Sequence, residues 1–215
     1  NVTGIYERKP VPALVEMMQT IAASSEIKGN PRAIFISDKS HSAIRDHNFM
    51  KTENWNPVIY NGHKSFDTFV EWKEYVLDSA KETDFLLIGG YRKLHRDKKV
   101  MHENDKKSRP GQTVSAKEVA SWTEQHSPVP VLGMNIFNAS DGAMVSIGVS
   151  PYEQGEVAAN MALDLISGRK TIDEIPIQTS KQYVVSIRRS ALDKRNIKLP
   201  QVFEAFARST NNYIP

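Results

Sequence analysis

Cysteine is absent from this chain of 215 residues, which excludes disulfide bonds and thiolate metal sites within it. No run of about 18 apolar residues occurs, so the sequence predicts no membrane-spanning helix. The first ten residues lack the basic and apolar segments of a signal peptide. Hydrophobic residues make up 40% and charged residues 25% of the chain, which is typical of a folded globular protein with one large or two small domains.

An excess of one charge is also lacking. The formal net charge is +3 at pH 7, too small by itself to indicate a nucleic-acid partner. The most basic stretch runs from Arg92 to Arg109; it contains no aromatic residue and is interrupted by Asp97, Glu103 and Asp105. Because basic stretches that bind nucleic acid are interleaved with aromatic residues, we interpret this one as a solvated loop and predict no nucleic-acid partner.

Motifs for catalysis and cofactor binding are missing as well. The patterns G-x-G-x-x-G, G-x-x-x-x-G-K-[ST] and G-x-S-x-G do not occur, and none of the six histidines forms an H-x-x-x-H pair. We therefore predict no cofactor, no metal site and no catalytic residue. Asp38 and Asp141 both follow predicted strands, where they can form a carboxylate pair across a cleft or cap turns; the sequence leaves both readings open.

Short apolar runs alternate with amphipathic segments along the chain. The runs predict strands at residues 32–37, 84–90, 129–134, 143–149 and 182–188. Helices are predicted at residues 12–21, at residues 66–79 after Ser65, after the capping box formed by Ser115 and Glu118, and after Ser150. Strands that alternate with helices predict a parallel, doubly wound α/β sheet, and continuous apolar strands indicate that both of its faces are covered.

The segment from Gly148 to Gly168 contains the best-marked helix. Ser150 and Glu153 have the spacing of a capping box, Pro151 occupies the first helical position, and the final glycine is typical of a helix end. One apolar face recurs at helical spacing and comprises Val157, Met161, Leu165 and Ile166. We predict that this face packs on another surface, because an exposed apolar stripe is unusual for a stable monomer.

Ligands of doubly wound sheets bind beyond the carboxyl ends of the strands. Four polar stretches follow the predicted strands there, at residues 37–42, 89–93, 135–141 and 150–155. The ligand-binding residues predicted from these stretches are Ser37, Asp38, Tyr91, Arg92, Asn135, Phe137, Asn138 and Asp141.

The chemistry of these side chains suits a small polar molecule. Arg92 can pair with a ligand carboxylate and Asp141 with a ligand ammonium. Phe137 or Tyr91 can stack on an apolar or aromatic group, while the serine and the asparagines supply neutral hydrogen bonds. Turn capping and packing against neighbouring loops are equally compatible with these positions.

Several segments, taken in order, resemble one family. The opening "NVTGIYERKPVPALVEMMQTI" is similar to the start of the second lobe in the periplasmic substrate-binding proteins of ABC importers. Residues 129–200 are similar to the end of that family: a strand, a helix that begins at "GVSPYEQG", a "K…IP" linker and a last strand. The resemblance covers most of the chain. It is specific at residues 148–168 and 175–200, and loose at residues 41–127.

The resemblance implies the type I fold, in which two α/β lobes joined by hinge strands close on a small ligand. It assigns residues 1–147 to the second lobe, residues 148–176 to a hinge crossing with a helix that packs on the first lobe, and residues 177–215 to a return strand and a helical tail. Thr3 then lies at the hinge and faces the cleft. In the family a first lobe precedes the segment that begins at Asn1. We therefore expect that lobe, or another chain, to cover the apolar helix face.

The function implied by the resemblance is non-catalytic binding of a small solute, amino-acid-like or otherwise polar. The solute would be delivered to the membrane subunits of an ABC importer at the periplasmic or extracellular face. An extracytoplasmic sensor domain with a signalling partner stays open as an alternative. An enzyme on a flavodoxin-like sheet and the effector domain of a lactose-repressor-like regulator are further alternatives. In the tail, Val202, Phe203 and Phe206 share a helical face that docks on the lobe or leads toward a membrane.

Overall fold

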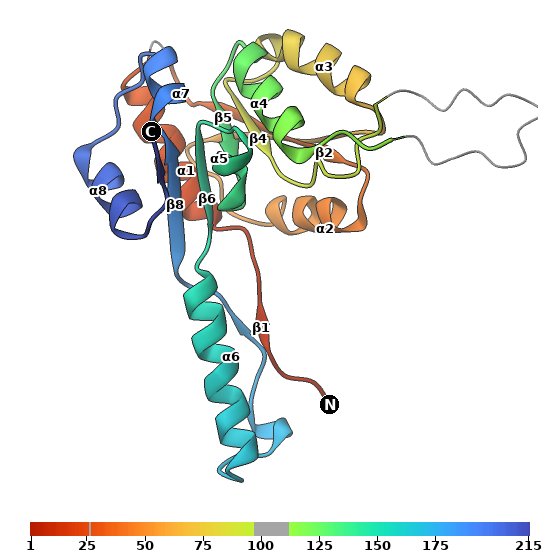
Figure 1. Ribbon diagram of the computed structural model, residues 1–215, viewed down its shortest axis with the longest axis vertical. Helices are drawn as coiled ribbons and strands as arrows, with labels where there is room; N and C mark the ends of the chain where they lie inside the picture. Colours follow the sequence, from red (N-terminus) through yellow and green to blue (C-terminus); the bar gives the residue numbers. More distant parts are fainter. Residues whose placement is uncertain (26, 97–111) are drawn as a thin grey trace, which may run out of the picture.

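A seven-stranded sheet forms the centre of the computed structural model, which describes residues 1–25, 27–96 and 112–215 (Figure 1). Its strands are β2 (Arg32–Asp38), β3 (Ile59–Phe66), β4 (Phe85–Ile88), β5 (Val131–Gly133), β6 (Val145–Val149), β8 (Tyr183–Arg188) and β9 (Tyr213–Ile214). They lie in the order β3-β2-β4-β5-β6-β8-β9. The first five are parallel, β8 runs antiparallel to β6, and β9 pairs parallel with β8. The predicted doubly wound, mainly parallel α/β sheet is therefore confirmed.

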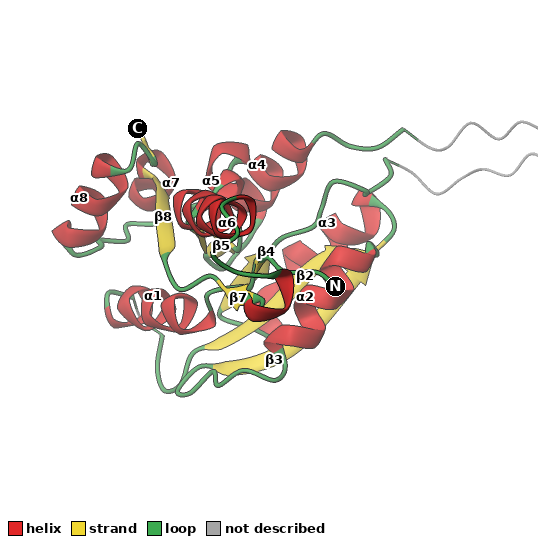
Figure 2. Ribbon diagram, turned by 90° about the horizontal axis from the view of Figure 1, so that it is seen from below, coloured by secondary structure: helices red, strands yellow, loops and turns green. Residues whose placement is uncertain are grey.

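Helices cover both faces of this sheet. They are α1 (Val11–Ala23), α2 (His41–Met50), α3 (Phe69–Asp78), α4 (Ala116–His126), α5 (Phe137–Asp141), α7 (Arg189–Lys194) and α8 (Gln201–Ser209). Because side chains alternate along a strand, Phe35 packs in the core with α1, whereas Ile34 and Ile36 pack in a second core with α3 and α4. Figure 2 shows α1 and α3 on opposite sides of the central strands. Together these helices and the seven-stranded sheet are called the sheet domain below.

Strand β3 and helix α2 were not predicted. β3 is an edge strand with the sequence IYNGHKSF, so it lacks the continuous apolar run that marks a buried strand. The predicted helix start directly after Ser65 is wrong, because Phe66 still belongs to β3 and the helix begins at Phe69. Thr68 caps α3 in a complete capping box with Glu71. The solvated loop predicted at residues 92–109 lies, from residue 97 on, outside the described residues.

Helix α6 (Pro151–Ile166) projects from the sheet domain (Figure 1) and is seen nearly end-on in Figure 2. Strands β1 (Ile5–Tyr6) and β7 (Gln178–Thr179) accompany it and pair with each other in parallel, and a short turn, η2 (Ile172–Glu174), follows the helix. We call α6, β1, η2 and β7 the arm. Ser150 caps α6 by accepting from the backbone N–H of Glu153, as predicted. The Glu153 carboxylate, however, accepts from the backbone N–H groups of Lys181 and Gln182 at 2.8–3.0 Å.

The apolar face predicted on α6 is divided in the structure. Met161 is buried, and its sulfur lies 3.9 Å from the Thr3 hydroxyl on the segment that leads into β1. Ile166, by contrast, is 83% exposed. It shares its side of α6 with Tyr152 and Leu163, which are also exposed. The chain itself therefore covers one side of the helix, and a different apolar side faces outward.

Helix α8 and strand β9 complete the sheet domain. Phe203 packs against the core beside α1, Ala207 is fully buried, and Arg189 pairs with Glu204 at 2.6 Å. Val202 is exposed, so only part of the predicted face docks. Of the two alternatives for the tail, the structure shows docking on the sheet domain. Among the described helices, none is both long enough and apolar enough to cross a membrane.

A buried ion pair joins α4 to α7. Glu124 is 4% exposed, its Oε1 pairs with Arg195, and its Oε2 has no hydrogen-bond partner among the described residues. Desolvation outweighs the attraction of Arg195 and raises the pKa of Glu124 to about 7. The folded chain therefore holds this proton at pH values where the unfolded chain releases it.

The first prediction concerns the pH dependence of stability. Because the folded state binds the extra proton between pH 4.5 and 7, the free energy of unfolding should fall as pH rises through that window. A rise of the pKa from 4.5 to about 7 corresponds to a loss of at most about 3 kcal/mol in the free energy of unfolding. Urea unfolding at several pH values should show a shallower fall in E124Q, whose neutral amide cannot titrate. Identical slopes in the two proteins would contradict the assignment.

Candidate ligand-binding site

The order of the strands creates a crevice at one edge of the sheet. Ile36, Ile88 and Gly133 lie side by side on β2, β4 and β5, so the three strands end at the same edge. After β2 the chain turns toward β3, whereas after β4 it turns toward β5, so the two loops diverge. This topological switch point is where ligands bind in such sheets.

A cavity of about 450 Å³ occupies this crevice. It is lined by Glu7, Lys9, Asp38, Ser40, Ser42, Asp46, Gly90, Tyr91, Arg92, Lys93, Asn135 and Phe137. The lining thus combines residues from the loops after β2, β4 and β5, from the start of α2, and from the segment between β1 and α1.

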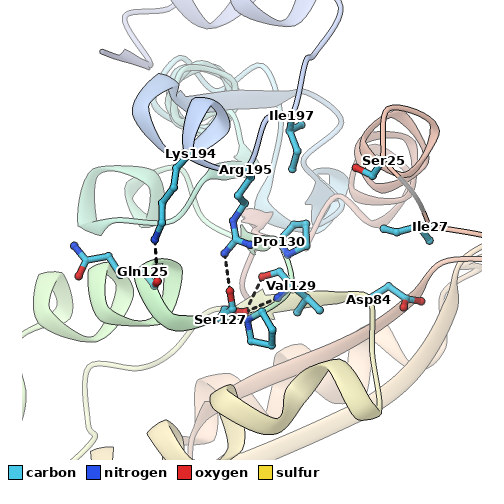
Figure 3. Close-up of a pocket in the computed structure, with 11 residues that line it drawn as sticks. Ser25, Ile27, Asp84, Gln125, Ser127, Val129, Pro130, Lys194, Arg195 and Ile197 are labelled. Atoms are coloured by element: carbon cyan, nitrogen blue, oxygen red, sulfur yellow. Dashed lines mark hydrogen bonds between the residues drawn. The ribbon is translucent and has the colours of Figure 1, made fainter.

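Another cavity, of about 470 Å³, lies at the opposite edge of the sheet (Figure 3). Its charged groups are engaged: Lys194 donates to the carbonyl of Gln125 at 2.8 Å, Arg195 donates to that of Ser127 at 3.2 Å, and Asp84 pairs with Arg32. We place the candidate site in the crevice at the switch point, where the topology opens the sheet and charged groups face the cavity.

Asp38 ties together the two loops that diverge at the switch point. Its backbone N–H donates to the carbonyl of Gly90 at 2.6 Å. Its carboxylate accepts from the backbone N–H of Ser40 at 2.9 Å and of Lys93 at 2.8 Å. Gly90 has φ +65°, a conformation that favours glycine. These contacts are those of a turn cap, and they shape the floor of the cavity.

Ser37 is buried beside the cavity rather than in its lining. Its hydroxyl donates to the carbonyl of Asp38 at 2.6 Å, so its contact of 2.7 Å with His63 Nε2 requires that the imidazole donates. Burial, together with the neighbouring His47, lowers the pKa of His63 to about 4. The imidazole is therefore neutral at pH 7, and the serine hydroxyl faces it instead of the cavity.

Tyr91, Asn138 and Asp141 form a hydrogen-bonded chain beneath the cavity. The buried Tyr91 hydroxyl donates to Asp141 at 2.8 Å and accepts from the Asn138 amide at 2.6 Å. The Asn138 carbonyl oxygen accepts from the backbone N–H of Asn135 at 2.8 Å. Burial raises the pKa of Tyr91, which keeps its hydroxyl a donor. The Tyr91 ring packs in the core against Trp72. Tyr91 therefore borders the cavity with the part of the residue that lies next to the loop, and not with its ring.

Arg92 and Phe137 form the outer rim of the cavity. The guanidinium lies 4.7 Å from the centre of the Phe137 ring, and its Nη2 is 3.4 Å from the Asp141 carboxylate. Arg92 and Phe137 are both exposed, the latter by 45%. This rim offers a cation and an aromatic face to a bound molecule.

Several lining residues were missed by sequence reasoning. Lys9 is 8% exposed, and its ammonium contacts Asn135 Oδ1 at 2.7 Å and Asp46 at 3.3 Å. The charged run at residues 7–9 begins two residues beyond the "NVTG" segment, but nothing in it marks Lys9 or Glu7 as cavity residues. Asp46 was missed because the polar helix α2 was not predicted.

The predicted site residues are only partly brought together. Those that line the cavity are Asp38, Tyr91, Arg92, Asn135 and Phe137. Those that lie outside its lining are Thr3, Ser37, Asn138 and Asp141. Thr3 is on the arm, and the other three support the loops from beneath. Ligand binding by these nine residues stays a prediction.

Comparison with known proteins follows this geometry. Residues 108–211 match the family model described as ABC transporter substrate binding protein. This part of the chain is similar to that family of substrate-binding proteins. No curated protein sequence matches it significantly.

Three solved structures share the fold of this chain, each with a TM-score of 0.62. A conserved domain protein from Vibrio cholerae is 16% identical and covers 96% of this chain and 62% of its own. An ABC domain from Streptococcus pneumonia, in complex with L-Trp, is 12% identical and covers 100% and 65%. A substrate binding protein with adhesive properties from Clostridium difficile, in a ligand-free, open structure, is 14% identical and covers 93% and 59%. The chain thus spans less than two thirds of the length of each.

The second prediction tests the hydrogen-bonded chain beneath the cavity. Tyr91→Phe leaves the buried Asn138 amide without its acceptor, so the free energy of unfolding should fall by about 1–3 kcal/mol. Tyr75→Phe is the matched control. Its hydroxyl bonds the exposed Glu82, so its effect should stay within about 0.5 kcal/mol. Urea unfolding measures both variants, and equal effects would argue against the special role of Tyr91.

Proposed function

We propose that this protein binds a small solute at the switch-point cavity, without chemical turnover, and delivers it to the membrane subunits of an ABC importer. The observation that carries the proposal is the cavity itself, which combines charges of both signs with an exposed aromatic ring at the edge where such sheets bind ligands. The match of residues 108–211 to the model of ABC transporter substrate binding proteins supports the same role. This function places the protein at the periplasmic or extracellular face.

The proposed solute is amino-acid-like. Arg92 at the rim suits a carboxylate, Glu7 and Asp46 suit an ammonium, and Phe137 suits an apolar or aromatic side chain. The structure from Streptococcus pneumonia, described as a complex with L-Trp, supports L-tryptophan as the first solute to test.

We further propose that the first lobe of the two-lobe fold closes the site by packing on the arm. Tyr152, Leu163 and Ile166 form an exposed apolar side of α6, and the related structures are longer than this chain. In this division residues 1–147 form one lobe, residues 148–176 carry the crossing, and residues 177–215 return to the lobe. Closure of two lobes would then enclose the solute.

The third prediction tests binding. L-Tryptophan at 100 times its dissociation constant should stabilise the protein by about 2.7 kcal/mol. R92Q should weaken binding about 10-fold to 100-fold, because it removes a charged hydrogen bond to the solute carboxylate. R45Q changes an exposed arginine of α2 outside the cavity lining and should bind normally. Thermal shift and titration calorimetry measure these effects, with sugars and nucleosides tested alongside amino acids. If no solute of any class binds, the proposal fails.

The fourth prediction tests whether a first lobe covers α6. Ile166→Asp should change the free energy of unfolding of the 215-residue chain by less than about 0.5 kcal/mol, because the side chain is already exposed. In a polypeptide extended by a preceding lobe, the same change should lower the unfolding free energy by about 2 kcal/mol or more, because it buries an unpaired charge. Asp173→Ala, on the exposed η2 turn, is the control. Equal small effects of Ile166→Asp in both polypeptides would show that no lobe covers α6.

A further inference from the structure

A buried ammonium group stands where the arm meets the cavity. The Lys9 side chain is 7% exposed, although lysine usually keeps its charged end in water. Its Nζ lies 2.7 Å from Asn135 Oδ1, 3.3 Å from the Asp46 carboxylate and 3.7 Å from the Glu7 carboxylate. All four residues line the switch-point cavity.

These contacts join elements that are distant in sequence. Lys9 lies between β1 of the arm and α1 of the sheet domain, Asp46 lies on α2, and Asn135 follows β5. One ammonium group therefore fixes the connecting segment of the arm to two sides of the cavity. Its two carboxylate partners are partly exposed, by 30% for Asp46 and 55% for Glu7, so water can hydrate them if Lys9 is replaced.

The contact with Asn135 also determines what this amide can offer. An ammonium group only donates, so the atom 2.7 Å from it is the amide oxygen. Nδ2 is then left with its two N–H donors, and it has no hydrogen-bond partner among the described residues. A molecule in the cavity therefore meets Asn135 as a donor, and its complementary group is an acceptor.

We propose that Lys9 is a positioning residue of the ligand site, which holds the Asn135 amide as a donor for a carboxylate or carbonyl oxygen of the solute. This inference rests on the proposed function, because it assumes that a solute occupies the cavity. It goes beyond that function by assigning the solute's acceptor group to Asn135 and by linking its recognition to the segment from which the arm extends.

The test compares two probes that differ by one carboxylate, L-tryptophan and tryptamine. In the wild-type protein, titration calorimetry should show L-tryptophan binding about 100-fold or more tightly than tryptamine, because both Arg92 and Asn135 meet the carboxylate. Lys9→Met should reduce that ratio about 10-fold by weakening L-tryptophan binding, with little change for tryptamine, because Arg92 still meets the carboxylate. Lys9→Arg, which keeps the charge and the donors, should restore most of the ratio. Lys64→Met is the control. Lys64 lies on the edge strand β3, pairs with Glu82 and is not part of the cavity lining.

The possible outcomes separate the inference from the function. Equal weakening of both probes in Lys9→Met, or no weakening of either, would overturn the inference while leaving solute binding intact. If neither probe binds the wild-type protein, the side-chain amide signals of Asn135 in nuclear magnetic resonance decide the inference, assigned by their loss in Asn135→Asp. In the wild-type protein the two amide proton signals should have well-separated chemical shifts and report a rigid side chain. In Lys9→Met the side chain should be mobile and the shifts averaged. Unchanged signals in Lys9→Met would refute the positioning role.

Discussion

The carboxylate of Asp38 is the constraint on which the candidate site depends. At the switch point the loops after β2 and β4 leave in opposite directions, and nothing in the sheet ladder itself holds them at a fixed separation. Asp38 supplies that connection through two hydrogen bonds: its backbone N–H donates to the carbonyl of Gly90, and its carboxylate accepts from the backbone N–H of Lys93. A third bond, from the backbone N–H of Ser40 to the same carboxylate, holds the loop after β2. Because the residue is buried, each of these bonds is protected from competition with water. Hydrogen bonds to backbone groups therefore hold the cavity floor in place, and the side chains above the floor remain available to contact a ligand.

The sequence predicts the sheet well because its central strands are continuous apolar runs, which only a sheet covered on both faces requires. It does not reveal β3 or α2, because an edge strand and a largely exposed helix lack that pattern. The same limit applies to the site. Strand ends locate Arg92, Asn135 and Phe137 at the cavity, but the direction of a side chain depends on packing. Ser37 accordingly faces His63, and Lys9 reaches the cavity through tertiary contacts that no local pattern encodes.

The apolar residues of helix α6 predict one buried face from the sequence, but they form two different sides of the helix in the structure. Its apolar residues were predicted to form one face, yet the structure divides them between β1 and the outside. A helix with apolar residues on most of its circumference is typical of a buried helix. Such a helix is consistent with contacts on two sides, one made by the chain itself and one by the lobe that we propose.

The bond between Glu153 and the returning chain has a mechanical consequence. Its carboxylate holds the backbone of Lys181 and Gln182 against the first turn of α6, so the outgoing and returning segments leave the sheet domain at one clamped point. Helix α6 ends at Ile166, 13 residues beyond Glu153, so the part beyond the clamp is about 20 Å long. A rotation of about 10° at the clamp would displace the far end by about 3 Å. The helix would then act as a lever, which converts a small change of backbone angle at the clamp into a larger displacement at its tip.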